Sequence, residues 1–315
     1  MKPDIRKILC PALVLTLAVS TALTGCGKNS KTRQTPAETD IETTSAESSA
    51  PELTKALDSS ESFEKEESPS QAPMESSEKN NWSDLSNKSQ GWGPGVNFNE
   101  KNQPEGSLSC QKKYGNYRAD FIGSDTEDKI IWLTLDEGYE NGYTSKILDV
   151  LKEKDCQAVF FITGSYARNN EDLIRRMIDE GHVIGNHSWS HPADGMPSLS
   201  VEDQISEIIR LHDYVSEHYD YEMSLFRNPA GIFSERSLAV TQSLGYRSMF
   251  WSFAYADWDP DHQPDQAEAL KKLTDRLHPG ALYLLHAVSE TNTAILSDFI
   301  DQARSLGYEF RLPES

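Results

Sequence analysis

Basic residues are scarce in this sequence. Lysine and arginine together number 30 against 50 aspartates and glutamates, which gives a formal net charge of −20. Binding to nucleic-acid phosphates needs clustered basic side chains, so this balance argues against a nucleic-acid partner. The sequence also lacks a glycine-rich turn after its first β-rich apolar run, at 130–135, and this absence weakens a nucleotide-binding function.

Cysteine is equally sparse, with four in the whole chain. Cys10 lies in the N-terminal apolar segment and Cys26 follows it, which leaves Cys110 and Cys156 for the rest of the sequence. A disulfide between these two is chemically permitted in an exported protein, and two free or buried thiols are an equal alternative.

The N-terminal apolar run, at 8–22, is too short and too interrupted to be a comfortable membrane-spanning helix. Its basic start, short apolar core and small residues are typical of a secretory signal. Leu-Thr-Gly-Cys at 23–26 resembles the bacterial lipobox, which implies a signal peptide over 1–25 and a lipid on the Cys26 thiol. We therefore expect an exported protein, anchored by lipid to the outer face of the bacterial cytoplasmic membrane and facing the wall. An ordinary cleaved signal or an uncleaved anchor is the alternative.

Large apolar residues are sparse from 26 to 89, where Ser, Thr, Glu, Pro and Lys dominate. Such a composition buries too little apolar surface to offset the entropy lost on ordering. We therefore expect 26–89 to be a disordered acidic tether that holds the rest of the chain away from an anionic membrane and wall.

The remaining segment, 90–315, is long enough for a single domain with a sizeable core. Strands are predicted at 130–135, 158–163, 181–186, 225–227, 247–253, 281–285 and 308–312. Helices are predicted at 145–154, 173–178, 201–218, 235–244, 266–277 and 293–306. This alternation implies parallel strands, and so many repeats favour a closed or nearly closed α/β barrel over the competing open doubly wound sheet.

The stretch His-Ser-Trp-Ser-His-Pro at 187–192 carries two histidines four positions apart. Two imidazoles in a fixed local bend are a natural pair of ligands for a divalent metal such as zinc. Pro192 disfavours helical geometry at His191, which indicates a loop at the tip of the preceding strand. Two unconnected surface histidines are the alternative.

Other polar residues also stand at the ends of predicted strands, namely Asp136, Glu137, Arg227, Asp257 and His286. In a parallel barrel the carboxyl ends of all strands open on one face, so these residues would converge on one site. Each also has a purely structural alternative: a solvated turn acid, a surface charge, a helix cap or a buried core histidine.

Five motifs follow one another along the domain: Thr-Leu-Asp-Glu-Gly at 134–138, the histidine motif at 187–192, Arg-Asn-Pro at 227–229, Asp-Trp at 257–258 and Leu-Leu-His at 284–286. Together they resemble the motifs of the polysaccharide deacetylases, the NodB-like carbohydrate esterase family 4. The resemblance covers nearly all of 90–315 and implies a distorted (β/α) barrel that forms a single catalytic domain. The stretches at 91–93, 138–144, 232–235 and 250–252 resemble more narrowly the branch that makes muramic δ-lactam in peptidoglycan.

The resemblance implies a role for each matching residue. Asp136 corresponds to the general base, Arg227 to the residue that keeps this base ionised, His286 to the general acid, and Asp257 to the carboxylate that supports His286. The metal ligands would be His187, His191 and Glu137, with zinc as the expected ion and cobalt or manganese as alternatives. Substrate-binding positions would be Pro229, Ala230, Trp258 and Leu284, the last two lining a pocket for the acetyl methyl. The implied partner is the peptidoglycan glycan strand, and we expect a monomer.

Two positions depart from the family pattern. Glu137 stands where most members have Asp as the third metal ligand, and its extra methylene moves the carboxylate outward by about 1.5 Å. Either Glu137 still reaches the metal, or two histidines hold it together with water. Ala230 stands where members often carry a large side chain, so the sugar groove would be wider.

Two hypotheses from different classes remain. The first is a metal-dependent N-deacetylase of peptidoglycan amino sugars, with N-acetylmuramic acid as the leading substrate and N-acetylglucosamine or chitooligosaccharides as alternatives. The second is a wall-binding module on the same fold, inactive because Glu137 no longer holds metal. The presence of Asp136, Arg227, Asp257 and His286 together favours the enzyme, since a binding module needs no proton-transfer groups.

Overall fold

The computed structural model describes residues 82–124 and 126–314. The strands are β1 (Gln90–Gly91), β2 (Ala119–Asp120), β3 (Ile130–Glu137), β4 (Val159–Ile162), β5 (Val183–Asn186), β6 (Leu225–Phe226), β7 (Ile232–Phe233), β8 (Arg247–Met249), β9 (Ala281–His286) and β10 (Glu309–Phe310). The α-helices are α1 (Glu105–Tyr114), α2 (Thr144–Glu153), α3 (Gly164–Asn169), α4 (Glu171–Asp179), α5 (Val201–Tyr219), α6 (Glu235–Ser243), α7 (Gln266–Asp275) and α8 (Glu290–Ser305). Short 3-10 turns lie at Trp82–Asp84, Gly115–Tyr117, Met196–Ser198 and Pro229–Gly231.

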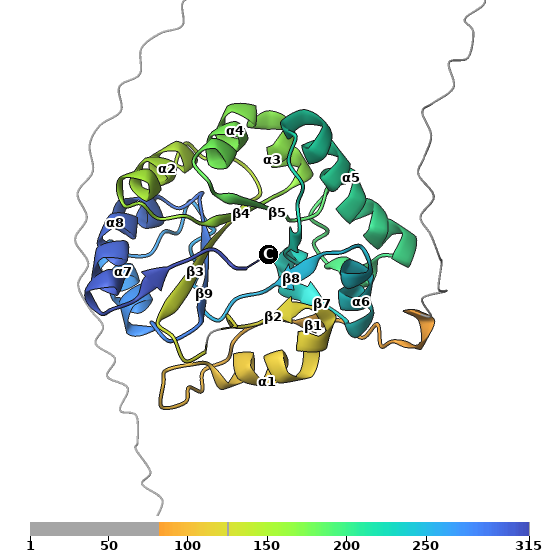
Figure 1. Ribbon diagram of the computed structural model, residues 1–315, viewed down its shortest axis with the longest axis horizontal. Helices are drawn as coiled ribbons and strands as arrows, with labels where there is room; N and C mark the ends of the chain where they lie inside the picture. Colours follow the sequence, from red (N-terminus) through yellow and green to blue (C-terminus); the bar gives the residue numbers. More distant parts are fainter. Residues whose placement is uncertain (1–81, 125, 315) are drawn as a thin grey trace, which may run out of the picture. The chain divides into compact units, whose positions relative to one another are not determined.

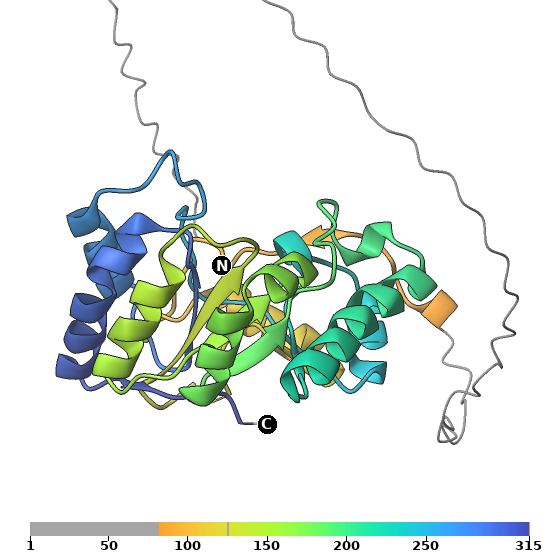
Figure 2. The ribbon, with the colours of Figure 1, turned by 90° about the horizontal axis from the view of Figure 1, so that it is seen from above.

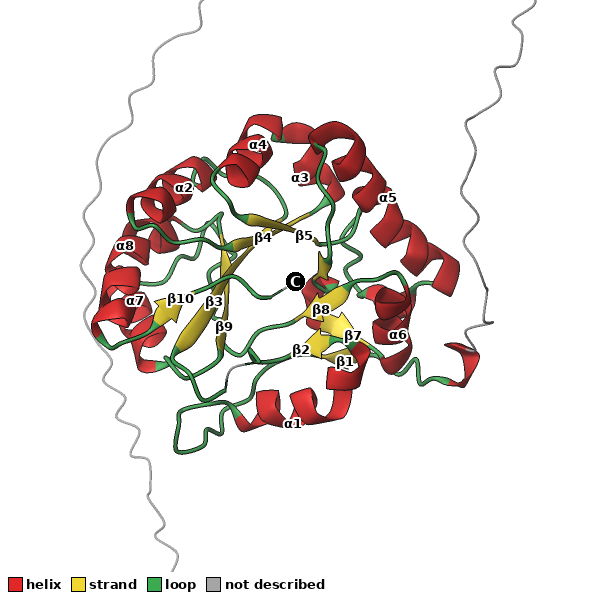
Figure 3. Cartoon of the chain, viewed as in Figure 1, coloured by secondary structure: helices red, strands yellow, loops and turns green. Residues whose placement is uncertain are grey.

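Parallel strands form the centre of the domain. β3 is buried along its whole length and pairs with β9 on one edge and β4 on the other. From β4 the sheet continues through β5, β6 and β8 to β2, while β10 pairs with the start of β3. A hydrogen bond of 2.8 Å from Gly123 N to Gly280 O and a bridge between Phe253 and Tyr283 bring the far end of the sheet beside β9. Figures 1 and 3 show the helices outside this ring of strands. The predicted distorted (β/α) barrel is confirmed, in place of the open doubly wound sheet.

The two faces of β3 contact different cores. Leu133 and Leu135 belong to the large apolar cluster that the strands share with the surrounding helices. Trp132 belongs to a smaller cluster with Phe161 and Met249, made by the opposite faces of the strands. Because successive side chains of a strand point to opposite faces, each strand packs outward on helices and inward on the other strands. Figure 2 shows α2, α4 and α5 side by side along one outer face.

Each predicted strand and helix has a counterpart in the structure, with ends that shift by a few residues. The exception is 247–253, where only Arg247–Met249 is a strand. The short elements α3, β1, β2 and β7 and the helix α1 were not predicted. Elements of two to six residues carry too few positions for a periodic pattern, and α1 has three consecutive polar residues near its end, Gln111–Lys113, that weaken its apolar face.

Cys110 is half-buried on α1, Cys156 is buried before β4, and both are free thiols. The free-thiol alternative is therefore the one found. No helix among the described residues is both long enough and apolar enough to span a membrane.

The N-terminal boundary of the domain differs from the prediction. The predicted signal peptide, Cys26 and the tether as far as residue 81 lie outside the described residues. Residues 82–89, the last part of the predicted tether, belong instead to the folded domain. Asn87 Nδ2 donates to Pro197 O (2.9 Å), Ser234 Oγ donates to Asn87 Oδ1 (2.9 Å), and Arg236 N donates to Ser86 O (3.1 Å). Composition missed this segment because polar hydrogen bonds, not apolar burial, hold it.

Deleting residues 27–81 is expected to leave the melting temperature of the protein unchanged, because the contacts of Ser86 and Asn87 are kept. Extending the deletion to residue 89 removes at least four hydrogen bonds to the rest of the domain, including one from Arg236 Nη2 to Leu85 O, each worth about 1 kcal/mol net. It should lower the melting temperature by roughly 8–16 °C. Thermal unfolding of the two shortened proteins measures the difference. A large loss from the first deletion would show that 27–81 stabilises the domain.

Candidate active site

Most of the predicted site residues converge at the carboxyl ends of β3, β5, β6 and β9. Asp136 lies at the end of β3, His187 and Arg227 directly follow β5 and β6, and His286 is the last residue of β9. A pocket of about 560 Å³ opens between them. Its lining residues are Asp136, Gly138, Tyr139, His187, His191, Asn228, Ala230, Gly231, Trp251, Ala254, Trp258, Leu284, His286 and Val288.

Asp136 and Arg227 form a buried ion pair at the base of the pocket. Arg227 Nη1 donates to Asp136 Oδ1 at 2.7 Å, while its Nε and Nη2 donate to the carbonyl oxygens of Met249 and Phe250, both at 3.0 Å. Arg227 is fully buried and therefore acts from behind the pocket, without lining it. Burial alone would raise the pKa of Asp136, but the charge and hydrogen bond of Arg227, with the charge of His286, hold it below its usual range. Asp136 is thus kept as a carboxylate.

The two histidines of the 187–192 motif lie together on a tightly bent loop. Their ring centroids are 4.7 Å apart, and His191 has a left-handed backbone, with φ of 53°. The bend is held by Ser188 Oγ, which accepts from His191 N at 3.0 Å. The structure therefore confirms the loop expected from Pro192 and brings the two imidazoles into contact.

His187 is oriented as a neutral imidazole. Its Nδ1 donates to the backbone oxygen of Arg227 at 2.9 Å, so Nε2 carries the lone pair, and Nε2 lies 3.5 Å from Asp136 Oδ2. Burial lowers the pKa of His187 to about 4, although the charge of Asp136 opposes this effect. An unprotonated ring nitrogen beside a second imidazole is a pair of donors that fits a divalent cation.

His286 and Asp257 form a second pair on the other side of the pocket. His286 Nδ1 bonds Asp257 Oδ1 at 2.7 Å, and the other oxygen, Oδ2, accepts from His286 N (2.9 Å) and Asn292 Nδ2 (2.6 Å). Asp257 is fully buried, whereas His286 lines the pocket. Burial alone would lower the pKa of His286, but the hydrogen bond and charge of Asp257, with the charge of Asp136, raise it above its usual value. His286 is thus held as a proton donor.

Glu137 does not join the histidines. β3 continues through this residue, so the pleat turns its side chain to the helix-facing side, opposite to Asp136. Its two carboxyl oxygens each lie 3.5 Å from Thr144 Oγ1, and it is fully buried. Burial, with the charges of Glu140 and Asp136, raises its pKa well above the usual value. Within 82–124 and 126–314, no three His, Cys, Asp or Glu side chains are grouped to hold a metal. The structure therefore does not bring Glu137 to the histidines as the predicted third ligand, and its geometry fits the two-histidine alternative.

Replacing Glu137 by glutamine is expected to leave bound metal and melting temperature nearly unchanged, because burial and the neighbouring carboxylates raise the pKa of Glu137 and favour its uncharged form. Glutamine keeps the shape and the hydrogen bond with Thr144. Metal analysis of purified Glu137→Gln beside the unaltered protein makes the comparison. Loss of metal from the variant would restore Glu137 as a ligand.

Three of the four predicted substrate-binding residues line the pocket, and the fourth, Pro229, lies behind its wall. Trp258 is 56% exposed at the mouth, with its ring centroid 5.9 Å from that of His286, and Leu284 is a buried wall. Ala230 lines the pocket in a left-handed conformation, with φ of 53°. Pro229 is buried and supports this turn without lining the pocket.

Three further lining residues, Tyr139, Trp251 and Asn228, had no predicted role. All three lie within motifs that carried the family resemblance. Tyr139 is half exposed directly after a strand end, and an exposed aromatic residue at that place is the signal that could have identified it.

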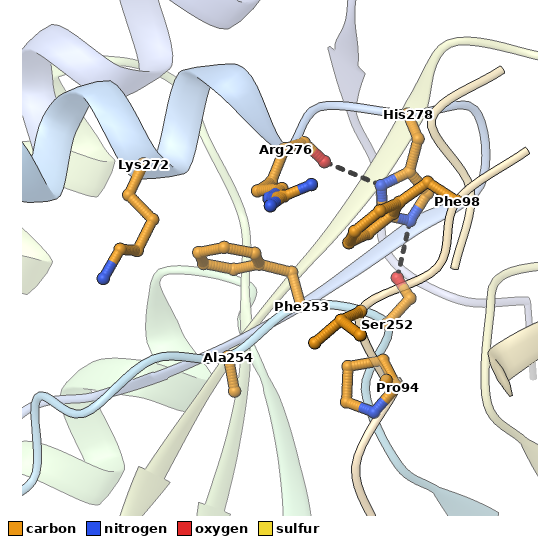
Figure 4. Close-up of a pocket in the computed structure, with 10 residues that line it drawn as sticks. Pro94, Phe98, Ser252, Phe253, Ala254, Lys272, Arg276 and His278 are labelled. Atoms are coloured by element: carbon orange, nitrogen blue, oxygen red, sulfur yellow. Dashed lines mark hydrogen bonds between the residues drawn. The ribbon is translucent and has the colours of Figure 1, made fainter. Parts of the chain in front are cut away.

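A smaller cavity of about 190 Å³ lies between α7 and the segment 94–98 (Figure 4). It shares only Ala254 with the main pocket. His278 within it bonds Ser252 Oγ (2.8 Å) and the backbone oxygen of Arg276 (2.7 Å), and burial lowers its pKa to about 4. This histidine is therefore a neutral structural group, and none of the predicted site residues lines the cavity.

Comparisons with known proteins agree with this geometry. A sequence model described as polysaccharide deacetylase matches residues 123–249. The peptidoglycan-N-acetylmuramic acid deacetylase PdaA of Bacillus subtilis is 40% identical over 210 residues, which span 66% of this chain and 78% of PdaA. The chain belongs to the polysaccharide deacetylase family. This membership confirms the predicted fold class and the predicted enzyme class, a hydrolase of N-acetyl amide bonds in polysaccharides.

Solved structures and other relatives place the deacetylase domain in the same group. The structure of Bacillus subtilis PdaA, described as a family 4 carbohydrate esterase, superposes with a TM-score of 0.68 at 37% identity, covering 72% of this chain and 96% of that one. The peptidoglycan-N-acetylglucosamine deacetylase PgdA of Listeria monocytogenes is 30% identical over 183 residues, which span 58% of this chain and 38% of PgdA.

Proposed function

We propose that this protein is a metal-dependent N-deacetylase of peptidoglycan that acts on N-acetylmuramic acid in muramic δ-lactam formation. The observation that carries the proposal is that one pocket holds two oppositely tuned groups. Asp136 is bonded to Arg227, which lowers its pKa, and His286 is bonded to Asp257, which raises its pKa. Groups whose pKa values are pushed apart in this way suit a base and an acid acting in one reaction. The similarity to PdaA supports the muramic sugar as the substrate.

Amide hydrolysis needs both groups, because an acetamide is a poor electrophile and its amine leaves poorly unless protonated. Asp136 takes a proton from the water that attacks the acetyl carbonyl, with Arg227 holding the carboxylate in place. His286 gives a proton to the departing nitrogen through Nε2, since Nδ1 is bonded to Asp257. Leu284 and Trp258 enclose the acetyl methyl.

His187 and His191 would hold the divalent metal, for which zinc is the expected ion and cobalt or manganese the alternatives. When bound, the metal supplies Lewis-acid polarisation of the carbonyl and acidification of water. The chain's contribution is to keep His187 neutral and oriented, through its bond to the Arg227 backbone oxygen.

Replacing His187 or His191 by alanine is expected to remove bound metal and acetate release together, because a two-point anchor loses most of its affinity with one point. Elemental analysis and an acetate assay on the same preparation make the test. A His187→Ala protein with normal metal content would exclude the pair as ligands.

The substrate is tested by mass analysis of muropeptides after incubation of peptidoglycan with the purified protein. Loss of one acetyl group from muramic residues is the expected result. Loss from glucosamine residues would support the N-acetylglucosamine alternative, and binding to the wall without any loss would support the inactive binding module.

The proposal includes the cellular location. A lipid on Cys26 would anchor the exported protein to the outer face of the cytoplasmic membrane, and 27–81 would give a monomeric domain reach into the wall. The lipobox-like sequence and the acidic composition of that segment support this part.

A further inference from the structure

A second cavity continues from the catalytic pocket past His191. Its volume is about 430 Å³, and it shares the wall residues Gly138, Tyr139 and His191 with the catalytic pocket. The rest of its wall comes from Thr163, Ser165, Arg168, Trp189 and Ser190. A sugar whose acetamide lies beside His191 therefore has its neighbouring substituents within reach of this second cavity.

Arg168 is the only lysine or arginine that lines either cavity among the described residues. Its Nε donates to Gly164 O at 3.2 Å, and its guanidinium carbon lies 4.8 Å from the centroid of the Trp189 ring. No carboxylate of the described residues forms an ion pair with it, although acidic residues greatly outnumber basic ones in this chain. Its two terminal nitrogens are thus available to a ligand.

The position of Arg168 is fixed by a close approach of two backbones. Gly164 N donates to Trp189 O at 3.1 Å, and a Cβ added to Gly164 would lie 2.7 Å from that oxygen and 2.6 Å from the Trp189 ring. Thus α3 packs directly on the loop that carries both histidines. Thr163 Oγ1 caps α3 by accepting from Tyr166 N at 3.2 Å, and donates to Gly138 O at 3.2 Å. The backbone of α3 that carries Arg168 is therefore held at a set place relative to His191, while the Arg168 side chain is exposed.

We propose that this second cavity is a carboxylate subsite, in which Arg168 recognises an acid on the substituent next to the scissile acetamide. The inference rests on the proposed function and adds a residue that would select muramic acid over glucosamine. Muramic acid differs from glucosamine by a lactyl ether on the ring carbon adjacent to the acetamide carbon, and this ether ends in a carboxylate. Arginine binds carboxylates with two parallel hydrogen bonds, and the hydroxyls of Ser165 and Thr163 complete a polar wall. A stem peptide converts the same carboxylate to an uncharged amide, so the subsite favours muramic residues that carry no peptide.

The test compares three substrates: a muramic glycan with free lactyl carboxylates, the same glycan with stem peptides, and a chitooligosaccharide. Arg168→Ala is expected to lower kcat/KM on the first by about 10- to 100-fold, mainly through KM, and to leave the other two within about twofold. Arg168→Lys should keep part of the preference, since it retains the charge and loses the two-point geometry. Added salt should raise KM for the first substrate alone.

Arg210 provides a matched control. Its guanidinium carbon also packs on the Trp189 ring, at 4.0 Å, but it does not line the cavity. Arg210→Ala should therefore leave all three substrates unchanged, whereas an effect equal to that of Arg168→Ala would mean that both arginines act by supporting Trp189 and would overturn the subsite. The carboxylate subsite would also be overturned if Arg168→Ala left kcat/KM unchanged on all three substrates, or lowered it by the same factor on all three.

Calorimetric binding of the peptide-free muramic glycan separates this inference from the proposed reaction. If the unaltered protein binds this glycan but releases no acetate, the proposed reaction fails. The subsite then stands if Arg168→Ala weakens binding about tenfold or more, and it fails if binding is unchanged.

Discussion

Replacing Arg227 by methionine is expected to cost about 3–5 kcal/mol of unfolding free energy and to lower the rate of deacetylation severely. Arg227 is fully buried and bonds Asp136 Oδ1 at 2.7 Å, so its removal leaves a carboxylate in the barrel interior without its hydrogen-bonded positive partner. The carboxylate would then take up a proton, because only the charges around it oppose the effect of burial on its pKa. A protonated Asp136 cannot act as a base, and the rate should fall by about 10²–10⁴-fold.

Asp136→Asn provides the control that separates stability from catalysis. This variant removes the base but also the buried negative charge, so Arg227 is left with its two backbone acceptors, Met249 O and Phe250 O. The double variant Asp136→Asn with Arg227→Met should recover part of the stability lost in Arg227→Met, because it leaves no unpaired charge, and should stay inactive. Denaturant unfolding of the three proteins checks this. If Arg227→Met unfolds like the unaltered protein, the ion pair does not stabilise the barrel.

The sequence predicted which residues meet in the pocket better than it predicted where each side chain points. Asp136, His187, Arg227 and His286 come from four strands, and their convergence follows from the parallel barrel, in which all strands end on one face. Hydrophobic patterning was sufficient for this prediction because it needs only the order and direction of the strands.

Glu137 was misplaced because the predicted strand ended too early. A strand ending at 135 would leave both acids in a turn, where either side chain could face the metal. The structure continues β3 through Glu137, so the two neighbouring acids fall on opposite faces. Asp136 lies on the face that also carries Trp132, and Glu137 lies on the face that meets Thr144. A difference of two residues at a strand end therefore decides which of the two acids faces the pocket, and hydrophobic patterning does not locate strand ends that closely.

The parts missed altogether are held by contacts that leave no periodic pattern. Residues 82–89 join the domain through polar hydrogen bonds, and the six-residue helix α3 packs where Gly164 permits close approach to Trp189. Such contacts depend on pairs of residues far apart in the chain. A single sequence carries no direct signal for them.

Replacing Asp257 by asparagine is expected to move the alkaline limb of the pH–activity profile to lower pH and to lower the maximal rate about 10²-fold or more. Activity requires protonated His286, so it falls as pH rises through the pKa of this histidine. Burial alone lowers that pKa, and the hydrogen bond and charge of Asp257 raise it above the ordinary value. Asparagine removes the charge, the pKa of His286 falls, and the proton is lost at a lower pH. The acid limb, set by Asp136 and Arg227, should stay in place.

The exposed pair Asp259 and His262 is the matched control, because it has the same contact at 2.8 Å and does not line the pocket. Asp259→Asn should leave the profile and the melting temperature unchanged. The competing interpretation of Asp257 as a structural cap predicts the reverse for Asp257→Asn: a lower melting temperature with the alkaline limb unmoved. Asp257 Oδ2 accepts a hydrogen bond from Asn292 Nδ2, so both interpretations allow Asp257→Asn to lose some stability. A lower melting temperature alone therefore does not distinguish them. The position of the alkaline limb in a well-folded variant decides, since only a carboxylate acting through His286 can move it.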